Sequence, residues 1–177
     1  MATHVLLLRG VNLGKHNKLN MQKLCVALTN KGLEEVKYHL QSGNVLLKSK
    51  KKSATLETEV GQIIKQTFNI DVPVLAIDKK TFKDYVDNFP FENKTKDWKD
   101  YCHFTFLAEK PSSEKIDELL AEQKENEKVV VYNQIAYLFL EKKYHESIIN
   151  NNFIEKKLGV SCTTRNWNTF DRIYSLF

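Results

Sequence analysis

The sequence predicts an α+β protein built from two units that repeat one order of strands and helices. Short segments of apolar residues indicate strands, and segments with apolar residues at every third or fourth position indicate helices. In each half, two strand segments flank a short polar turn, as expected of a β-hairpin. A chain of 177 residues is long enough for two small, closely packed units.

The first half has the order βαββαβ, which is the order of a ferredoxin-like unit. Its first helix ends at Gly32, and residues 41–44 (QSGN) form the turn of its hairpin. Ser53 is the expected N-cap of the second helix. The predicted strands are residues 3–9, 36–40, 45–48 and 72–77, and the predicted helices are residues 21–28 and 56–67.

The second half repeats much of this order, so we predict two ferredoxin-like subdomains, residues 1–78 and residues 79–177 with a terminal helix. The hairpins at 36–48 and 128–140 occupy equivalent places, which favours an internal duplication. The predicted elements are a helix capped by Asp78, strands at 101–107, 128–132, 135–140 and 160–163, and helices that begin at Ser112, at Glu146 and near Trp167.

The formal charge of +5 is concentrated in the first part of the chain. Residues 1–76 contain 11 Lys and Arg against 5 Asp and Glu, whereas residues 77–177 contain 16 against 17. Such an asymmetry is typical of a surface that meets phosphates or another polyanion. The alternative is that these lysines, including the four at 48–52, only solvate the outer faces of the first half.

The remaining composition argues against a membrane protein, a disulfide framework and a metal centre. No apolar run approaches the roughly 20 residues of a membrane-spanning helix, and Arg9 interrupts the apolar start, which disfavours a signal peptide. The three cysteines are scattered, which suits a reducing cytosol, and the five histidines lack metal-ligand spacing. We therefore expect a cytoplasmic protein with no cofactor and no metal.

The loop after the first strand, residues 9–20 (RGVNLGKHNKLN), is basic and contains two glycines. It is not a Walker nucleotide-binding loop, because only three residues separate Gly10 from Gly14 and His16 stands where the motif needs Ser or Thr. Glycines still allow backbone N–H groups to converge on an anion. The alternative is a plain connection with both glycines at positive φ. An anion could be contacted there by the charged side chains of Arg9, Lys15 and Lys18 and by the neutral donors Asn12 and Asn17.

The segment 163–169 (TTRNWNT) holds more polar groups than a helix cap requires. Arg165 can make a forked contact with a phosphate or carboxylate, and Trp167 can stack on a base or another planar ligand. The alternative places Trp167 in the core, with Asn166 and Thr169 bonded to backbone ends.

Three motifs of the chain resemble those of the bacterial "domain of unknown function 1697" family. They are residues 6–14 (LLLRGVNLG) with Asn17, Lys18 and Met21 after them, residues 41–45 (QSGNV), and residues 158–160 (LGV) followed by 163–169 (TTRNWNT). They lie near both ends of the chain and in the expected order, so the resemblance covers essentially the whole chain. It implies a small bacterial α+β protein with two ferredoxin-like subdomains and brings no established activity. Lys15 is a departure, because the family commonly has a second glycine there.

Arginine and amide side chains at loop ends, framed by apolar elements, are more typical of ligand recognition than of folding. We therefore expect the three motifs to form one site in a cleft between the halves. The leading hypothesis is a binding module for a phosphate-bearing ligand, either nucleic acid or nucleotide. The aromatic pattern of RNA-recognition strands is absent, with Tyr38 as its nearest substitute. The expected binding residues are Arg9, Asn12, Lys18, Gln41, Ser42, Asn44, Arg165, Asn166, Trp167 and Asn168.

Two other functions are compatible with the sequence. An enzyme acting on a small anionic substrate would use Arg9 and Arg165 as clamps, although the sequence nominates no catalytic set of residues. A homodimeric or partner-binding protein would use Trp167 and the segment 89–91 (FPF) as hydrophobic anchors.

Overall fold

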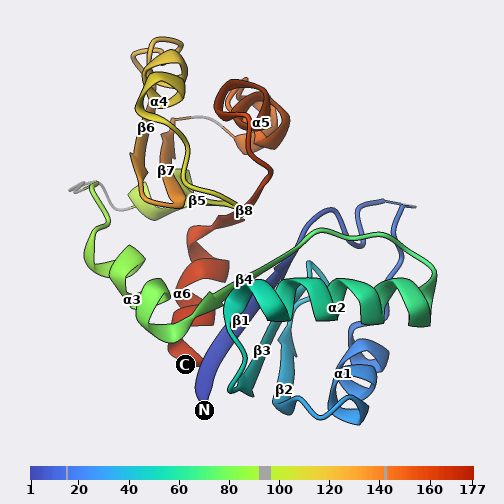
Figure 1. Ribbon diagram of the computed structural model, residues 1–177. Helices are drawn as coiled ribbons and strands as arrows, with labels where there is room; N and C mark the ends of the chain where they lie inside the picture. The colour runs from blue at the N-terminus through green and yellow to red at the C-terminus, as the bar shows by residue number, and fades with distance from the viewer. Residues whose placement is uncertain (15, 92–96, 142) are drawn as a thin grey trace. The chain divides into compact units, whose positions relative to one another are not determined.

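The structure is a computed structural model (Figure 1). It describes residues 1–14, 16–91, 97–141 and 143–177. Contacts divide the chain into two compact units: unit 1 comprises residues 1–83 and 173–177, and unit 2 comprises residues 84–172. A boundary at residue 78 between two folding domains stays a prediction.

Unit 1 contains the first set of elements in the predicted order. They are β1 (Ala2–Leu8), α1 (Met21–Asn30), β2 (Glu34–His39), β3 (Asn44–Ser49), α2 (Ser53–Phe68), β4 (Val74–Asp78) and the start of α3 (Lys79–Asp87). The strands form one sheet in the order β2-β3-β1-β4, with every pairing antiparallel. The ferredoxin-like arrangement predicted for the first half is thereby confirmed.

Unit 2 repeats both the order of elements and the order of strands. Its sheet has the order β6-β7-β5-β8, again antiparallel. The α+β fold with two four-stranded sheets is thus confirmed, whereas a duplication as its origin stays a prediction. The elements are the 3-10 helix η1 (Trp98–Tyr101), β5 (Cys102–Leu107), α4 (Ser113–Leu120), β6 (Glu127–Tyr132), β7 (Ile135–Leu140), the 3-10 helix η2 (Tyr144–Glu146), α5 (Asn151–Leu158), β8 (Cys162–Asn166) and α6 (Trp167–Ser175).

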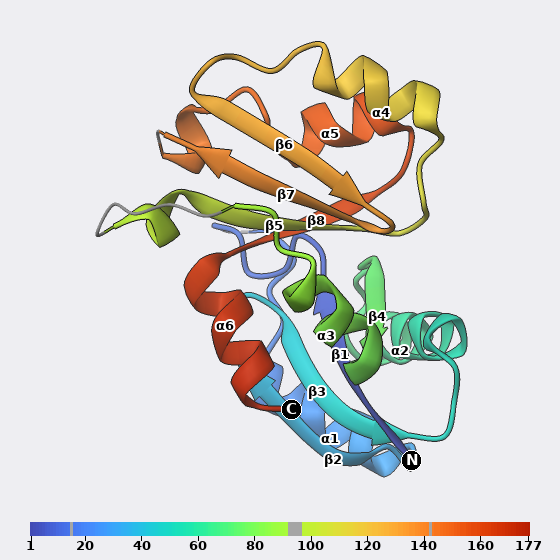
Figure 2. The same cartoon turned by 90° about the vertical axis from the view of Figure 1, so that its left-hand side faces the viewer.

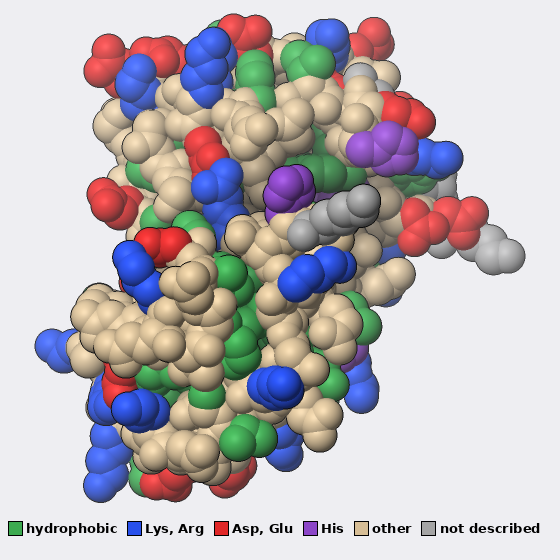
Figure 3. Space-filling view, turned by 90° about the vertical axis from the view of Figure 1, so that its right-hand side faces the viewer, with side chains coloured by type: hydrophobic (Ala, Val, Ile, Leu, Met, Phe, Trp, Pro, Cys, Tyr) green, Lys and Arg blue, Asp and Glu red, His purple; other side chains and the backbone are tan. Residues whose placement is uncertain are grey.

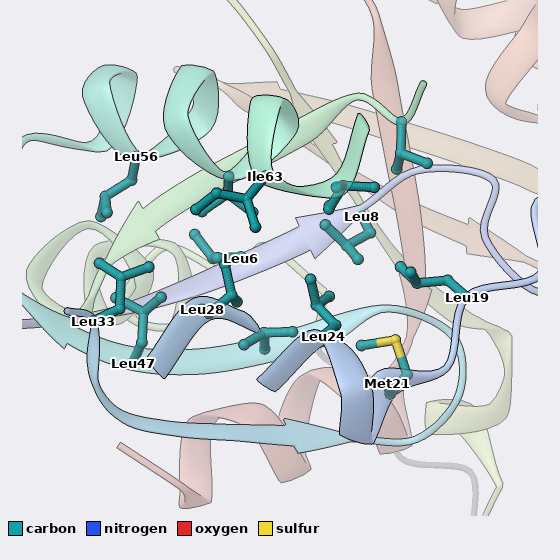
Figure 4. Packing of buried hydrophobic residues seen from close by; sticks show 14 of the residues in the cluster. Leu6, Leu8, Leu19, Met21, Leu24, Leu28, Leu33, Leu47, Leu56 and Ile63 are labelled. Atoms are coloured by element: carbon teal, nitrogen blue, oxygen red, sulfur yellow. The ribbon is translucent and has the colours of Figure 1, made fainter. Parts of the chain in front are cut away.

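The core of unit 1 lies between its sheet and the helices α1 and α2 (Figure 4). Leu6 and Leu8 of β1 face the helices, because alternate residues of a strand point to the same side. They pack with Leu24 and Leu28 of α1 and with Ile64 of α2. Full burial of one such side chain stabilises the fold by about 1.5–3 kcal/mol.

The opposite face of this sheet is buried as well. Val5 and Leu7 are 0% exposed, and Figure 2 shows the C-terminal end of α6 on this side of the sheet. Within unit 1 the ring of Phe82 lies 5.2 Å from that of Phe177. The central strand β1 therefore offers no exposed aromatic side chain of the kind that stacks on RNA bases. Tyr38, the predicted substitute, lies on the edge strand β2.

Two predictions about element ends are wrong. Ser53 is not the N-cap of α2 but its first helical residue, and the N-cap, Lys52, forms no side-chain hydrogen bond with the helix. The strand predicted at 160–163 lies further along the chain as β8, because five of its residues pair with β5. The polar segment 163–169 therefore begins within β8 and continues into α6.

The helix predicted to begin at Glu146 also begins later. The 3-10 helix η2 comes first, and α5 begins only at Asn151. Asn150 determines this start, because its side chain accepts a hydrogen bond from the Phe153 amide at 3.2 Å. A polar cap thus overrides the apolar periodicity on which the prediction rested.

Candidate functional site

The first two motifs meet at one end of the unit 1 sheet. β1 ends at Leu8 and β3 begins at Asn44, and because the strands are antiparallel these two ends are adjacent. The amide of Leu8 donates to the carbonyl oxygen of Gly43 at 2.8 Å, and the amide of Arg9 donates to that of Pro73 at 3.0 Å. Three connections therefore form one edge, which we call the loop edge: residues 9–20, 40–43 and 69–73.

Asn12 holds the loop edge together. Its backbone lies in the left-handed region at φ 56°, which asparagine tolerates better than most residues. Its carboxamide donates to the carbonyl oxygens of Leu19 at 2.9 Å and of Gln41 at 2.7 Å, and it accepts from the Leu19 amide at 2.9 Å. Because both of its N–H groups are occupied, Asn12 fixes the two loops against each other instead of offering a donor to a ligand.

Asn44 closes the hairpin turn in a similar way. It is 0% exposed, and its carboxamide donates to the carbonyl oxygen of His39 at 3.0 Å and to Ser42 Oγ at 3.1 Å. Gly43, beside it, has φ 80° and approaches the neighbouring loop so closely that a Cβ there would lie 2.6 Å from Val11 Cγ2. The turn is therefore packed directly on the β1–α1 loop.

Among the predicted binding residues of the loop edge, Lys18, Gln41 and Ser42 are exposed to solvent, and the same edge also exposes the polar side chains of residues 16, 17, 20, 69 and 71. Arg9, at the end of β1, is half-buried. The predicted contact residue Lys15 lies outside the described residues. An ammonium, an amide, a hydroxyl and a guanidinium along one edge are groups that contact phosphate oxygens in nucleic-acid complexes.

We expect Asn12→Gly to destabilise unit 1 by about 2 kcal/mol, because its side-chain hydrogen bonds are lost while its φ of 56° suits glycine. Asn17→Gly is the matched control. Asn17 also has positive φ, 45°, but with the described residues its side chain makes one hydrogen bond, to the carbonyl oxygen of Gly10 at 3.2 Å. Its loss should therefore cost below about 1 kcal/mol. Urea denaturation monitored by circular dichroism gives the free energy of unfolding of both variants. Equal costs would contradict the role assigned to Asn12.

The third motif lies in unit 2, and its first residues are engaged there. Arg165 on β8 is 8% exposed, and its Nη1 donates to Thr163 Oγ1 and to the carbonyl oxygen of Thr164, both at 2.8 Å. Burial lowers the pKa of the Arg165 guanidinium to about 10, which leaves it charged at neutral pH. Asn166 Oδ1 accepts from the Thr169 amide at 3.0 Å, so Asn166 caps α6.

Trp167 belongs to an aromatic cluster of unit 2. Its ring lies 5.2 Å from that of Trp98 and 5.3 Å from that of Phe89. Lys99 Nζ lies 4.9 Å from the ring centroid, in a cation–π contact. The indole is thus used inside unit 2, whereas Asn168, the next residue, is exposed.

The structure brings the predicted binding residues together in two groups. Whether the second group joins the first in one cleft stays a prediction. Arg9, Asn12, Lys18, Gln41, Ser42 and Asn44 lie at or beside the loop edge of unit 1, and Arg165, Asn166, Trp167 and Asn168 lie where β8 meets α6.

Residues 1–137 match the family model described as "Protein of unknown function (DUF1697)". The chain belongs to this family. The matched residues include both motifs of the loop edge, whereas the third motif lies beyond them. The family resemblance read from the sequence is thereby confirmed.

A similar solved structure is that of the conserved bacterial protein SP0830 from Streptococcus pneumoniae. It is 24% identical, with a TM-score of 0.71 over 99% of this chain and 98% of that one. At this identity the likeness concerns the fold. No curated protein matches the chain significantly.

A polar cluster of unit 2 is missing from the residues predicted to be functional. The hydroxyls of Thr105 and Thr164 lie 2.8 Å apart across β5 and β8, and Tyr144 donates to Asn151 Oδ1 at 3.2 Å. The ring of His103 stacks on Tyr144 with 5.0 Å between centroids, and burial lowers the pKa of His103. Thr105, Thr164, Asn151 and Tyr144 are linked by hydrogen bonds, as buried polar groups generally are. No sequence pattern signals the cluster, because its members come from separate segments of the chain.

Among the described residues, no three His, Cys, Asp or Glu side chains are grouped so as to hold a metal ion. Within the same residues, no helix combines the length and apolar character needed to cross a bilayer.

Proposed function

We propose that unit 1 binds the phosphates of a nucleic-acid strand at its loop edge. The net charge of unit 1 is the observation that supports this proposal most directly. Unit 1 contains 14 Lys and Arg against 6 Asp and Glu, a net charge of +8, whereas unit 2 contains 13 against 16. Binding of a polyanion to such a surface releases counterions, which favours association at low salt.

The loop edge supplies the contacts for such a strand. Lys18, Gln41 and Ser42 are exposed there, and the acid in the connection before β4, Asp71, pairs with Lys65 at 3.0 Å. Figure 3 shows basic side chains at several places in the lower half of the view. Separated cations on an open edge suit a long polyanion, whereas a small nucleotide needs a concave site.

The segment predicted as an anchor for a protein partner is engaged within unit 2. The ring of Phe89 lies 5.4 Å from that of Phe104 and 5.7 Å from that of Tyr137. The ring of Phe91 lies 5.9 Å from that of Phe139. These contacts favour the binding of a charged ligand by unit 1 over a hydrophobic interface centred on residues 89–91.

We expect Lys18→Ala to weaken binding of a single-stranded oligonucleotide by about threefold to tenfold at low salt. The loss of one phosphate contact should also reduce the slope of log K against log salt concentration by about 0.7. Arg9→Ala should weaken binding further when it is added to Lys18→Ala. Fluorescence anisotropy at salt concentrations between roughly 50 and 200 mM gives the affinity of the parent protein, of Lys18→Ala and of the double variant for the oligonucleotide.

The matched control is Lys31→Ala, which removes the same charge at the other end of α1, where Lys31 is the C-cap. It should leave affinity nearly unchanged. An affinity that falls equally in both variants would assign binding to overall charge and not to the loop edge. No binding at low salt, or a preference for ATP over the strand, would overturn the proposal.

A further inference from the structure

A hollow of about 480 Å³ opens at the end of unit 1 opposite the loop edge. β1 runs from this hollow, which its first residues line, to the loop edge, where it ends. β3 ends and α2 begins at the same place. The polar lining includes His4, Ser49, Lys50, Lys52, Ser53 and Asp78.

His4 contributes a ring nitrogen that no described residue satisfies. The side chain is 3% exposed, and it lies on the same side of β1 as Leu6 and Leu8. Among the described residues, its Nδ1 has no hydrogen-bonding partner. A buried polar atom without a partner destabilises the fold, and His4 is one of the residues that line the hollow.

The lysines around the hollow fall into two kinds. Lys48 and Lys51 each pair with a glutamate at 2.6 Å. Lys50 and Lys52 are exposed and, in the described part of the chain, have no acidic partner. The acid of the hollow, Asp78, is already engaged, because its two carboxylate oxygens accept hydrogen bonds from the first turn of α3. Positive charge therefore predominates in the lining.

α2 begins at the hollow with an uncapped first turn. Since Lys52 forms no side-chain hydrogen bond with the helix, the amides of Ser53 and Ala54 lack an acceptor in α2. A helix of 16 residues directs the positive end of its dipole to this point. Free amides at a helix N-terminus are ready donors to a phosphate group.

We propose that this hollow is an oxyanion site that takes a phosphate group, either free or carried by a small metabolite. The amides of Ser53 and Ala54, the ammonium groups of Lys50 and Lys52, and His4 in the tautomer with hydrogen on Nδ1 are its donors. The volume of the hollow leaves room for a group attached to the phosphate. Because the hollow lies at the other end of β1 from the loop edge, the inference goes beyond the proposed function and does not rest on it.

The direct test is a titration of the full chain with inorganic phosphate at constant ionic strength, followed by NMR of backbone amides. We expect saturable shifts of the Ser53 and Ala54 resonances with a Kd on the order of 1 mM, and no shifts with ribose. Tighter binding of ribose 5-phosphate than of inorganic phosphate identifies a carried phosphate, and the reverse order identifies the free ion. Titrations without saturable shifts at α2 would overturn the proposal.

Variants test the individual donors. Lys52→Ala should weaken phosphate binding about fivefold or more, because a charge-assisted contact is lost. Lys23→Ala, an exposed position in α1 with the same charge change, should leave it unaltered. His4→Leu should weaken binding about tenfold, while its Tm without phosphate equals or exceeds that of the parent because an unsatisfied polar atom is removed. Phosphate binding that survives both Lys52→Ala and His4→Leu would overturn the assignment.

Discussion

Gly43→Ala is expected to lower the free energy of unfolding of unit 1 by more than about 3 kcal/mol, from two separate effects. Gly43 has φ 80°, where a Cβ costs about 1 kcal/mol. That Cβ would also lie 2.6 Å from Val11 Cγ2 and 2.7 Å from Leu8 Cβ. Because Leu8 is held in β1 and its amide is bonded to Gly43, the overlap is relieved only by moving the turn, at about 2 kcal/mol or more.

Gly10→Ala separates these two effects. Gly10 also has positive φ, 69°, but a Cβ there would meet nothing within 4 Å. Its replacement should therefore cost only about 1 kcal/mol. Urea denaturation of both variants, monitored by circular dichroism, gives the difference. If the two replacements cost the same, the close approach of the turn to the β1–α1 loop contributes nothing to stability.

Phe104→Ala is expected to destabilise unit 2 by about 4 kcal/mol. Phe104 is 0% exposed, and its ring lies parallel to that of Phe170 with 3.6 Å between centroids. The rings of Phe89 and Trp167 lie 5.4 Å and 5.7 Å away. Truncation removes both the buried area and the ring contacts, and it leaves a cavity that rigid aromatic neighbours fill poorly.

The comparison for this variant is Ile148→Ala, a position that is 41% exposed and should cost less than about 1 kcal/mol. Thermal unfolding with tryptophan fluorescence reports on the cluster directly, since Trp98 and Trp167 both belong to it. A loss for Phe104→Ala no greater than that for Ile148→Ala would mean that the aromatic cluster does not stabilise unit 2.

The order of elements was predictable because each element has a local signature. Leu56, Val60, Ile63 and Ile64 recur at helical spacing, and all of them are buried on α2. The start of α5 was missed because Asn150 ends the preceding segment by a side-chain hydrogen bond. An asparagine side chain caps a helix at some positions and does not at others, and apolar periodicity does not distinguish the two kinds of position.

The candidate site was predictable in composition but not in the role of each residue. Asn12 and Asn44 stand at loop ends, where amides often contact ligands, yet their carboxamides bond to backbone carbonyl groups. One acceptor, in Gln41, is 29 residues from Asn12 along the chain. Whether an amide meets such an acceptor depends on which loops the sheet brings together, and that is a property of the folded chain.

The hollow at His4 was beyond prediction for a related reason. In the sequence His4 is a lone histidine at the start of an apolar strand, without metal-ligand or catalytic spacing. Its neighbours in the hollow come from residues 49–53 and from Asp78. The unsatisfied nitrogen becomes visible only when those segments are in place around it.

The hydrogen bonds of Asn12 affect how sequence variation at this position should be interpreted. Aspartate lacks the two N–H groups, glutamine has a longer side chain and less tolerance of φ 56°, and glycine lacks the carboxamide altogether. Selection for foldability alone would thus retain asparagine here. Evolutionary constancy at Asn12 would measure the requirement for joining two loops, and it would appear even in descendants that had lost every ligand.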